Sequence, residues 1–480
     1  MTLTLPFQNS YARLPERLFA RLDPTPVKTP RLLQLNLALA EQLGLDPAAL
    51  ASPDGIQFLA GNLVPAGAEP LAQAYAGHQF GQFNPQLGDG RAVLLGEIIG
   101  RDGRRFDLQL KGSGRTPWSR GGDGRAAVGP VLREYLISEA MHALGIPTTR
   151  ALAAVATGEE IFREEPQPGA VLTRVASSHL RVGTFQYFAA SGDVEALRIL
   201  TDYALARHYP AAEGARGLLA AVVARQAELV AQWMLVGFIH GVMNTDNCAI
   251  SGETIDYGPC AFMDSYSPDT VFSSIDRAGR YRYGHQPRIV HWNLTRLAEA
   301  LLPLLADEED AAIAIAQDVL AGFGDRFNAA WLGGLGRKLG LAEQRDGDPA
   351  LAQDLLNIMA EGQADFTLTF RHLANPGPLR ALFADTAALE DWLPRWHARL
   401  AAEPIPQAQR QAAMMAANPV IIPRNHLVEE ALQAAVEHSD LAPFNALLEV
   451  VRRPFDQPPD PRYALPAPNG LDGYQTFCGT

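Results

Sequence analysis

The chain has 480 residues, enough for a large core and two or more lobes, and its 47% hydrophobic and 19% charged residues are ordinary for a folded protein. Its net charge of −13 argues against a general nucleic-acid binder, because non-specific binding to nucleic acid depends on Lys and Arg side chains that neutralise phosphates. Three cysteines, Cys248, Cys260 and Cys478, are too few for a disulfide scaffold and suit a reducing compartment.

The N-terminus lacks the basic segment and apolar core of a secretory signal. We also expect no membrane span, because no apolar run reaches the roughly 20 residues that cross a bilayer. The chain is therefore expected to be a cytoplasmic monomer that binds neither nucleic acid nor membrane.

Residues 1–60 predict an N-terminal extension with one amphipathic helix at about 32–43, which Gly44 ends. The apolar run 92–99 predicts a strand, and 106–111 predicts a second strand because its residues alternate with period two. This alternation places Phe106, Leu108 and Leu110 on one face and Asp107, Gln109 and Lys111 on the other.

A glycine-rich loop at 112–129 leads into a predicted helix at 130–144, with Pro130 in the permitted first turn and Gly145 as its stop. The chain is predicted to become mainly helical after Gly183. Further strands are expected at 151–156 and 170–175, and further helices at 218–238, 295–321, 350–362, 386–400, 406–417 and 427–437.

Strands come first along the chain and helices second, which predicts an α+β fold with an active site between two lobes. We expect two lobes, a strand-rich N-lobe at 61–182 and a mainly helical C-lobe at 183–453. The Pro- and Gly-rich residues 454–480 predict an extended C-terminal tail.

One segment carries the clearest chemical pattern. Residues 240–247 read His-Gly-Val-Met-Asn-Thr-Asp-Asn, and Asp-Tyr-Gly follows at 256–258. This is the layout of the metal-binding half of a kinase-like phosphotransfer site, so we expect the two lobes to form a protein-kinase-like bilobal fold. Asn247 and Asp256 would supply the hard oxygen ligands that Mg²⁺ or Mn²⁺ prefers on nucleotide phosphates.

The proton acceptor is displaced in this loop. A protein kinase carries its base at the third loop position, where this chain has Val242. Asp246 is the only carboxylate left in the loop, which makes it the candidate base; a turn-capping carboxylate is the structural alternative. A site that keeps its metal ligands but moves its base is predicted to transfer something other than the terminal phosphate.

Lys111 ends a predicted strand and precedes glycines, as expected of a lysine that pairs with phosphate oxygens; a solvated edge-strand lysine is the alternative. The helix that follows offers both Glu134 and Glu139 as ion-pair partners, and periodicity does not choose between them. His240 is predicted to be structural, with its ring hydrogen-bonded to backbone, and Cys248 to be a packed thiol.

Two copies of Gly-Asp-Gly-Arg, at 88–91 and 122–125, flank Lys111 in the sequence. Glycines let backbone N–H groups approach an anion, although ordinary hairpin turns have the same composition. Arg174 and Arg181 stand at the junction of the predicted lobes, where they would bind phosphate oxygens or form inter-lobe salt bridges.

Taken together, these segments resemble the selenoprotein O family, called YdiU in bacteria, whose members are kinase-like protein adenylyltransferases. The resemblance runs nearly from end to end. It is carried by residues 87–91, 110–114, 119–125, 133–136, 145–149, 240–247, 256–260 and 423–426.

The resemblance implies that ATP binds in an orientation flipped relative to protein kinases, so that AMP is transferred to Ser, Thr or Tyr hydroxyls of proteins and pyrophosphate leaves. UMP transfer from UTP with Mn²⁺ is a second implied activity. By the same resemblance Asp246 accepts the proton, Asn247 and Asp256 hold Mg²⁺ or Mn²⁺, and Glu134 pairs with Lys111. The nucleotide is implied to contact Gly88, Gly90, Arg91, Lys111, Asp123, Gly124, Arg174, Arg181 and Asp256.

The chain departs from the family in its cysteines. Members named for selenocysteine carry it near the C-terminus, where this chain has Cys478, and in some relatives that cysteine pairs with one in the activation segment. The matching region here, 271–275, contains no Cys. Cys478 would then pair with Cys260, stay free, or bond transiently to a client protein.

Two other functions fit the same residues. One is a conventional kinase-like phosphotransferase, and the other is a nucleotide-binding pseudokinase scaffold whose output is an interaction with a partner.

Overall fold

A computed structural model describes residues 5–374, 378–468, 470–471 and 473–477. The fold is α+β, as predicted, and its largest sheet has eight strands with antiparallel pairing throughout. The strand order is β1 (Phe19–Arg21), β3 (Leu71–Gln73), β6 (Ala92–Ile99), β7 (Arg105–Lys111), β10 (Pro166–Ala176), β9 (Arg150–Phe162) and β2 (Arg31–Leu35), and β8 (Ala126–Ala127) also pairs with β10.

The alternation predicted for β7 is confirmed, and both of its faces are covered. Phe106, Leu108 and Leu110 pack in one apolar cluster with α1 (Leu37–Gln42) and α3 (Pro53–Leu59), while α2 (Pro47–Ala51) joins the same N-terminal layer. The polar face of β7 is also buried or half-buried rather than solvated. Its charged groups therefore need partners inside the protein.

The helix predicted at 32–43 is wrong over its first half. Residues 31–35 form β2, which pairs with β9, and only α1 is helical. The side chain of Asn36 accepts a hydrogen bond from the N–H of Leu39 and caps α1. Pairing along β9 outweighs the local helical pattern, so residues 1–60 contribute two strands, β1 and β2, to the sheet.

The helix predicted at 130–144 is confirmed as α4 (Val128–Ala143), which packs on β9 and β10. The single helix predicted at 295–321 is wrong, because α8 (Gln286–Leu305) ends and α9 (Glu309–Leu339) begins within it. Ala306 is extended, and the acidic residues Glu309 and Asp310 stabilise the new helix N-terminus.

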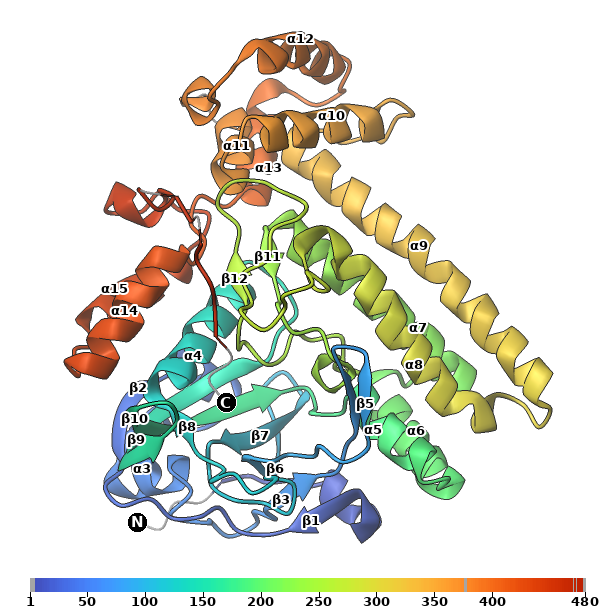
Figure 1. The fold of residues 1–480 in the computed structure, drawn as a ribbon, viewed down its shortest axis with the longest axis vertical. Helices are drawn as coiled ribbons and strands as arrows, with labels where there is room; N and C mark the ends of the chain where they lie inside the picture. The colour runs from blue at the N-terminus through green and yellow to red at the C-terminus, as the bar shows by residue number, and fades with distance from the viewer. Residues whose placement is uncertain (1–4, 375–377, 469, 472, 478–480) are drawn as a thin grey trace.

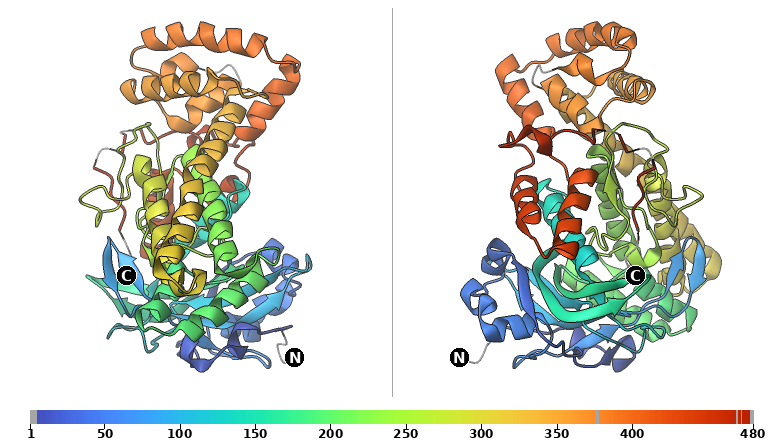
Figure 2. Two further views of the ribbon diagram at one scale, coloured as in Figure 1. Left: turned by 90° about the vertical axis from the view of Figure 1, so that its right-hand side faces the viewer. Right: turned by 60° about the vertical axis from the view of Figure 1, so that its left-hand side comes forward.

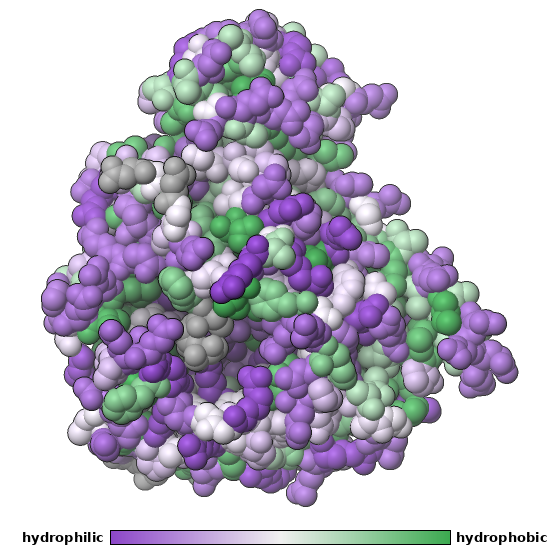
Figure 3. Space-filling model, in the orientation of Figure 1, coloured by the Kyte–Doolittle hydropathy of each residue, from purple (hydrophilic) through white to green (hydrophobic). Residues whose placement is uncertain are grey.

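The remaining α-helices include two groups beyond the sheet. Figures 1 and 2 show α10 to α13 at the end of the molecule farthest from the sheet, whereas α14 and α15 lie beside α4. The face in Figure 3 is mainly hydrophilic, with apolar side chains scattered over it. The α-helices whose bounds have not yet been given are α5 (Val182–Ala190), α6 (Val194–His208), α7 (Gly214–Leu235), α10 (Asp348–Glu361), α11 (Phe366–Ala374), α12 (Ala387–Ala401), α13 (Gln407–Ala417), α14 (Asn425–Glu437) and α15 (Ala442–Val451).

Helix α7 corrects the expectation that no segment has the length and apolarity of a membrane span. By length and composition it passes that test, but 61% of its most apolar window is buried within the protein. It packs against α8 and α9, which agrees with the long, largely buried helix predicted at 218–238.

A buried arginine joins three distant parts of the helical region. The guanidinium of Arg424 is fully buried and lies 2.6 Å from carboxylate oxygens of both Asp264 and Asp365. It also donates to the backbone carbonyl of Ala464. The next residue, Asn425, hydrogen-bonds the backbone of Phe262 in β12 (Ala261–Phe262), so the 423–426 segment is structural.

We expect Arg424→Leu to lower the free energy of unfolding by about 3–5 kcal/mol, because two buried carboxylates lose their cation. Urea unfolding would measure the change. Arg453→Leu is the matched control, because its ion pair with Glu449 is exposed and such pairs contribute roughly 1 kcal/mol or less. Equal losses in the two variants would contradict this assignment.

A second buried cation, Lys338, has no carboxylate within ion-pair distance in the described part of the chain. Its ammonium lies 4.6 Å from the ring centroid of Phe370 and 5.7 Å from that of Phe366. Burial lowers the pKa of Lys338 from 10.5 to about 7.

Between pH 7 and 10 the unfolded chain therefore holds a proton on Lys338 that the folded protein has lost, so this lysine makes stability rise with pH. We expect Lys338→Met to be more stable than the wild type at neutral pH. The difference in unfolding free energy should shrink above pH 7 by at most about 1.4 kcal/mol per pH unit. Chemical denaturation across this range measures it, and the exposed Lys28→Met is the control. A difference that does not change with pH would contradict the interpretation.

Candidate active site

A cavity of about 550 Å³ lies where the polar face of the sheet meets the 240–256 region. It brings together every residue predicted to bind the nucleotide or the metal or to accept a proton. These are Gly88, Gly90, Arg91, Lys111, Asp123, Gly124, Arg174, Arg181, Asp246, Asn247 and Asp256.

Lys111, at the end of β7, is shared between two carboxylates. Its Nζ lies 2.6 Å from Oε2 of Glu134 on α4 and 2.6 Å from Oδ1 of Asp256. Arg174 on β10 completes the cluster with a 2.6 Å contact to Glu134. Glu139, the other partner that periodicity allowed, pairs instead with Arg150. The side of α4 that faces Lys111 therefore carries Glu134.

This cluster keeps its carboxylates ionised. Burial raises the pKa of Asp256, but Lys111, Arg174 and Arg91 outweigh it and hold that pKa well below its ordinary value. Burial acts on Glu134 in the same direction, and Arg174 and Lys111 likewise bring its pKa below the usual range. Asp256 is thus a fixed negative charge with 30% of its side chain exposed to the cavity.

The pKa of Asp246 is shifted in the opposite direction from that of Asp256. Its side chain is buried, and burial raises its pKa to about 6, against the smaller lowering effects of its backbone hydrogen bond and of Arg181. Among the described residues its Oδ1 has no hydrogen-bond partner, and its Oδ2 receives a 3.4 Å contact from Gln79. A carboxylate with a free oxygen and a pKa near neutrality suits a general base.

Arg181 is held from several sides at the N-terminal end of α5. It donates to the backbone carbonyl of Asp246 at 3.1 Å and lies 3.5 Å from Oδ1 of the buried Asp89. Its guanidinium also stacks 4.4 Å from the ring centroid of Tyr75. These contacts aim a rigid cation along one wall of the cavity.

The first Gly-Asp-Gly-Arg segment is shaped by Trp118. A Cβ at Gly88 would lie 2.2 Å from the Trp118 ring, and Gly88 also has a φ of +57°. A Cβ at Gly90 would lie 2.8 Å from the backbone oxygen of Trp118. Gly88 therefore lets this turn pack closely against the indole of Trp118, and Gly90 lets it pack against the Trp118 backbone.

In the second copy, Asp123 pairs with Arg163 at 2.9 Å and accepts the N–H of Arg125. Gly124 has a φ of +69°, and a Cβ there would lie 2.0 Å from the carbonyl oxygen of Gly114. The loop is thus closed by side-chain and backbone contacts at the cavity edge.

The 240–247 loop is anchored from both sides. His240 is buried, and its Nε2 lies 2.9 Å from the carbonyl oxygen of Ile255, which confirms the structural role predicted for it. The hairpin of β4 (Gly77–Gln79) and β5 (Gln82–Asn84) covers the loop, because the His78 N–H donates to Thr245 and the Phe80 N–H to Asn244.

Asn247 and Asp256 fit a divalent cation by the chemistry of their free atoms. The Asn247 amide nitrogen donates to the carbonyl of Val242, which leaves the amide oxygen as a possible ligand. Asp256 uses Oδ1 for Lys111 and keeps Oδ2. Within the described ranges no group of three or more His, Cys, Asp or Glu side chains forms a metal site. Nucleotide phosphates and water would supply the other ligands of a Mg²⁺ or Mn²⁺ ion.

A second cavity of about 560 Å³ shares Arg91, Lys111 and Asp256 with the first. Residues 474–477 of the tail form part of its wall, and the Thr476 hydroxyl donates to the carbonyl of Pro259. Its apolar wall is formed by Ala126, Val131, Leu172, Leu432 and Val436.

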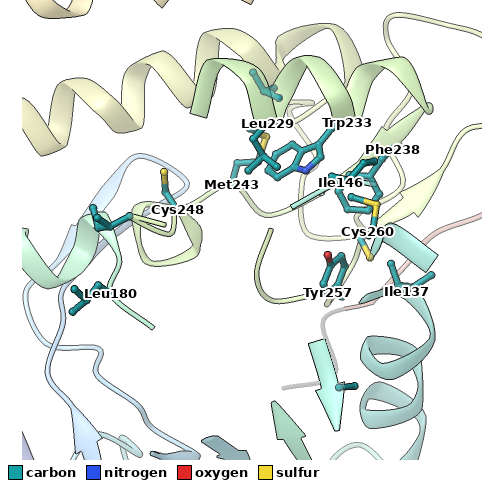
Figure 4. Close-up of a cluster of buried hydrophobic side chains, with 14 of the residues drawn as sticks. Ile137, Ile146, Leu180, Leu229, Trp233, Phe238, Met243, Cys248, Tyr257 and Cys260 are labelled. Carbon is teal, nitrogen blue, oxygen red and sulfur yellow. The ribbon is translucent and has the colours of Figure 1, made fainter. Parts of the chain in front are cut away.

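Cys248 and Cys260 are free thiols at separate places in one buried apolar cluster (Figure 4). Burial raises the pKa of Cys248 to about 12 and that of Cys260 to about 11, so neither is a nucleophile at neutral pH. The packed thiol predicted for Cys248 is confirmed. Cys478 lies outside the described residues.

Sequence reasoning missed several residues that shape the cavity. Asp89 lies inside a recognised motif, of which only the glycines and the arginine were predicted to act. Tyr75 and Gln79 belong to short strands or turns without a chemical pattern, and Trp118 lies in a loop identified by its glycines. Of these residues, only Asp89 could have been found from the sequence, because it lies within a Gly-Asp-Gly-Arg motif.

Comparisons with known proteins identify the family of the chain. The sequence profile of the family described as protein adenylyltransferase SelO matches residues 1–452. The chain is 64% identical to a protein nucleotidyltransferase YdiU of Methylorubrum extorquens. It is also 62% identical to that of Rhodopseudomonas palustris (strain BisB5) and 61% to that of Bradyrhizobium diazoefficiens. Each alignment covers 100% of both chains. The chain therefore belongs to the SelO family of protein adenylyltransferases.

Proposed function

We propose that this protein transfers AMP from ATP to Ser, Thr or Tyr hydroxyls of other proteins and releases pyrophosphate. It would work as a kinase-like enzyme with an N-terminal extension (1–60), an N-lobe (61–182), a helical C-lobe (183–453) and a tail (454–480). Because its described thiols are buried and free, we place it in the cytoplasm, and we expect it to act as a monomer.

The observation that carries the proposal is the contrast between the two cavities that meet at Lys111 and Asp256. One cavity is lined by several arginines, including Arg174 and Arg181, which suit the triphosphate. The other has an extensive apolar wall, which suits a nucleobase. A nucleotide that spans both would place its α-phosphate at the junction and its β- and γ-phosphates among the arginines. This orientation is flipped relative to a protein kinase.

The chemistry follows from these positions. The acceptor hydroxyl loses its proton to Asp246 as its oxygen attacks the α-phosphorus, and the bond from that phosphorus to the bridging oxygen of pyrophosphate breaks. Arg174 and Arg181 stabilise the charge that develops on the leaving pyrophosphate. Bound between Asn247 and Asp256, Mg²⁺ or Mn²⁺ would neutralise phosphate charge.

We expect α-labelled ATP to label acceptor proteins and γ-labelled ATP to leave them unlabelled. Mass spectrometry of a modified client protein would identify the nucleotide, and labelled UTP tested in parallel would reveal UMP transfer. Asp246→Asn should lower labelling by roughly 100-fold or more, because it removes the base, and should leave the affinity for ATP nearly unchanged. Transfer of the γ label would indicate a conventional phosphotransferase. Partner binding without any transfer would indicate a pseudokinase scaffold.

We expect Asp256→Asn to have opposite effects on two measurable affinities. Calorimetry should show that Mg²⁺ no longer strengthens ATP binding, because a charged ligand is lost. Metal-free ATP binding should be retained or strengthened, because Lys111 is released from one of its two carboxylates. Unchanged stimulation by Mg²⁺ would contradict the metal assignment.

A further inference from the structure

A locally basic segment of this acidic chain lies next to the candidate active site. Between residues 277 and 296 there are five arginines and no acidic residue, in a protein with a net charge of −13. Four of these arginines lie on or directly before helix α8, and we call them the basic strip: Arg280, Arg282, Arg288 and Arg296.

The strip follows one side of α8. Arg288, Trp292 and Arg296 are spaced by four residues and so share a face of that helix. The guanidinium of Arg280 lies 4.9 Å from the Trp292 ring centroid, and that of Arg296 lies at the same distance. Arg282 pairs with Asp269 at 3.2 Å and Arg296 with Glu299 at 2.6 Å. Within the described chain, Arg280 and Arg288 have no carboxylate at ion-pair distance, and Arg288 is exposed.

Two histidines lie beside the strip, His78 against Trp292 and His285 against Arg282, and burial is the largest cause of the lowered pKa of each. Burial, followed by Arg296 and Arg280, lowers the pKa of His78, although its hydrogen bond with Gln186 acts in the opposite direction. Burial, followed by Arg282 and Arg288, likewise lowers the pKa of His285, with a smaller opposing effect from Asp269.

The β4–β5 hairpin links the strip to the base of the proposed reaction. Arg280 packs against Gly81 in the β4–β5 hairpin, and the neighbouring Tyr281 hydroxyl donates to Asn244 at 2.8 Å. The same hairpin carries Gln79, which contacts Asp246. Phe83 on β5 is 42% exposed, and its ring lies 4.8 Å from that of His78. An acceptor segment that reaches Asp246 past this hairpin therefore meets arginines and one exposed aromatic ring.

We propose that the basic strip is the docking surface for an acidic segment of the protein acceptor, which it holds so that a nearby hydroxyl reaches Asp246. The inference rests on the proposed function and adds the substrate class to it. An overall acidic enzyme repels acidic polypeptides at long range, so a local patch of arginines selects them at short range. Its contribution should weaken at high salt, because exposed charges are screened.

The test uses three short synthetic peptides that each carry one serine, flanked by glutamate, glutamine or lysine. Fluorescence anisotropy measures their affinity for the full chain, and transfer from α-labelled ATP is measured separately. We expect the wild type to bind the glutamate peptide most tightly. Arg288→Glu should weaken that binding roughly threefold to tenfold and should strengthen binding of the lysine peptide, because the charge is exchanged. Arg280→Gln provides a second variant that removes charge at the other end of the strip.

Arg31→Glu on β2 is the matched control, because Arg31 is exposed and β2 is an edge strand of the large sheet, away from α8. The proposal is overturned if the wild type binds all three peptides equally, or if Arg288→Glu and Arg31→Glu act alike. It is also overturned if a single-stranded oligonucleotide displaces the glutamate peptide as well as excess glutamate peptide does, since the strip would then be a general polyanion site. Charge-dependent binding without any transfer would support the strip and refute the proposed function instead.

Discussion

The position of one ammonium group, that of Lys111, determines how the rest of the site is arranged. It lies 2.6 Å from Glu134 and 2.6 Å from Asp256, so one cation joins the central sheet, helix α4 and the segment that follows the 240–247 loop. Arg174 provides the additional positive charge that lets both carboxylates stay ionised in a largely buried place. A phosphate group that approaches this cluster meets cations already held in position, so little reorganisation is needed on binding.

Buried charged groups are likewise paired with opposite charges along the polar face of β7. Asp107 is buried and pairs with Arg207, while Gln109 donates to Asp89, which in turn lies near Arg181. A strand that alternates apolar and polar residues normally exposes its polar side, but here both sides are covered. The buried charges on this face are retained because each has a partner of opposite sign, and the network holds Arg181 and Arg207 in place.

Charge is also distributed unevenly on a larger scale. The chain is acidic overall, yet arginines gather in the cavity and on the outer side of α8 next to it. The first group is enclosed and suits phosphate, whereas the second is partly exposed and suits a polypeptide. The β4–β5 hairpin lies between them, because it contacts both Asp246 and Arg280. This distribution supports the proposal that two anionic partners bind at adjoining surfaces of a protein without an overall positive charge.

Local patterns in the sequence determined the strands at 92–99 and 106–111, helix α4, the 240–247 loop and the predicted site residues, all of which line the cavity. These features depend on periodicity or motif spacing, which a short segment carries by itself. Tertiary structure alone decided that Glu134 rather than Glu139 meets Lys111, since the two point to different sides of α4 and Glu139 is bound by Arg150. It also made residues 31–35 a strand, because the edge of β9 offers hydrogen bonds that a helical pattern cannot reveal. The same reason explains why the cavity is also lined by Tyr75, Gln79 and Trp118, because contacts between distant segments depend on how the whole chain packs.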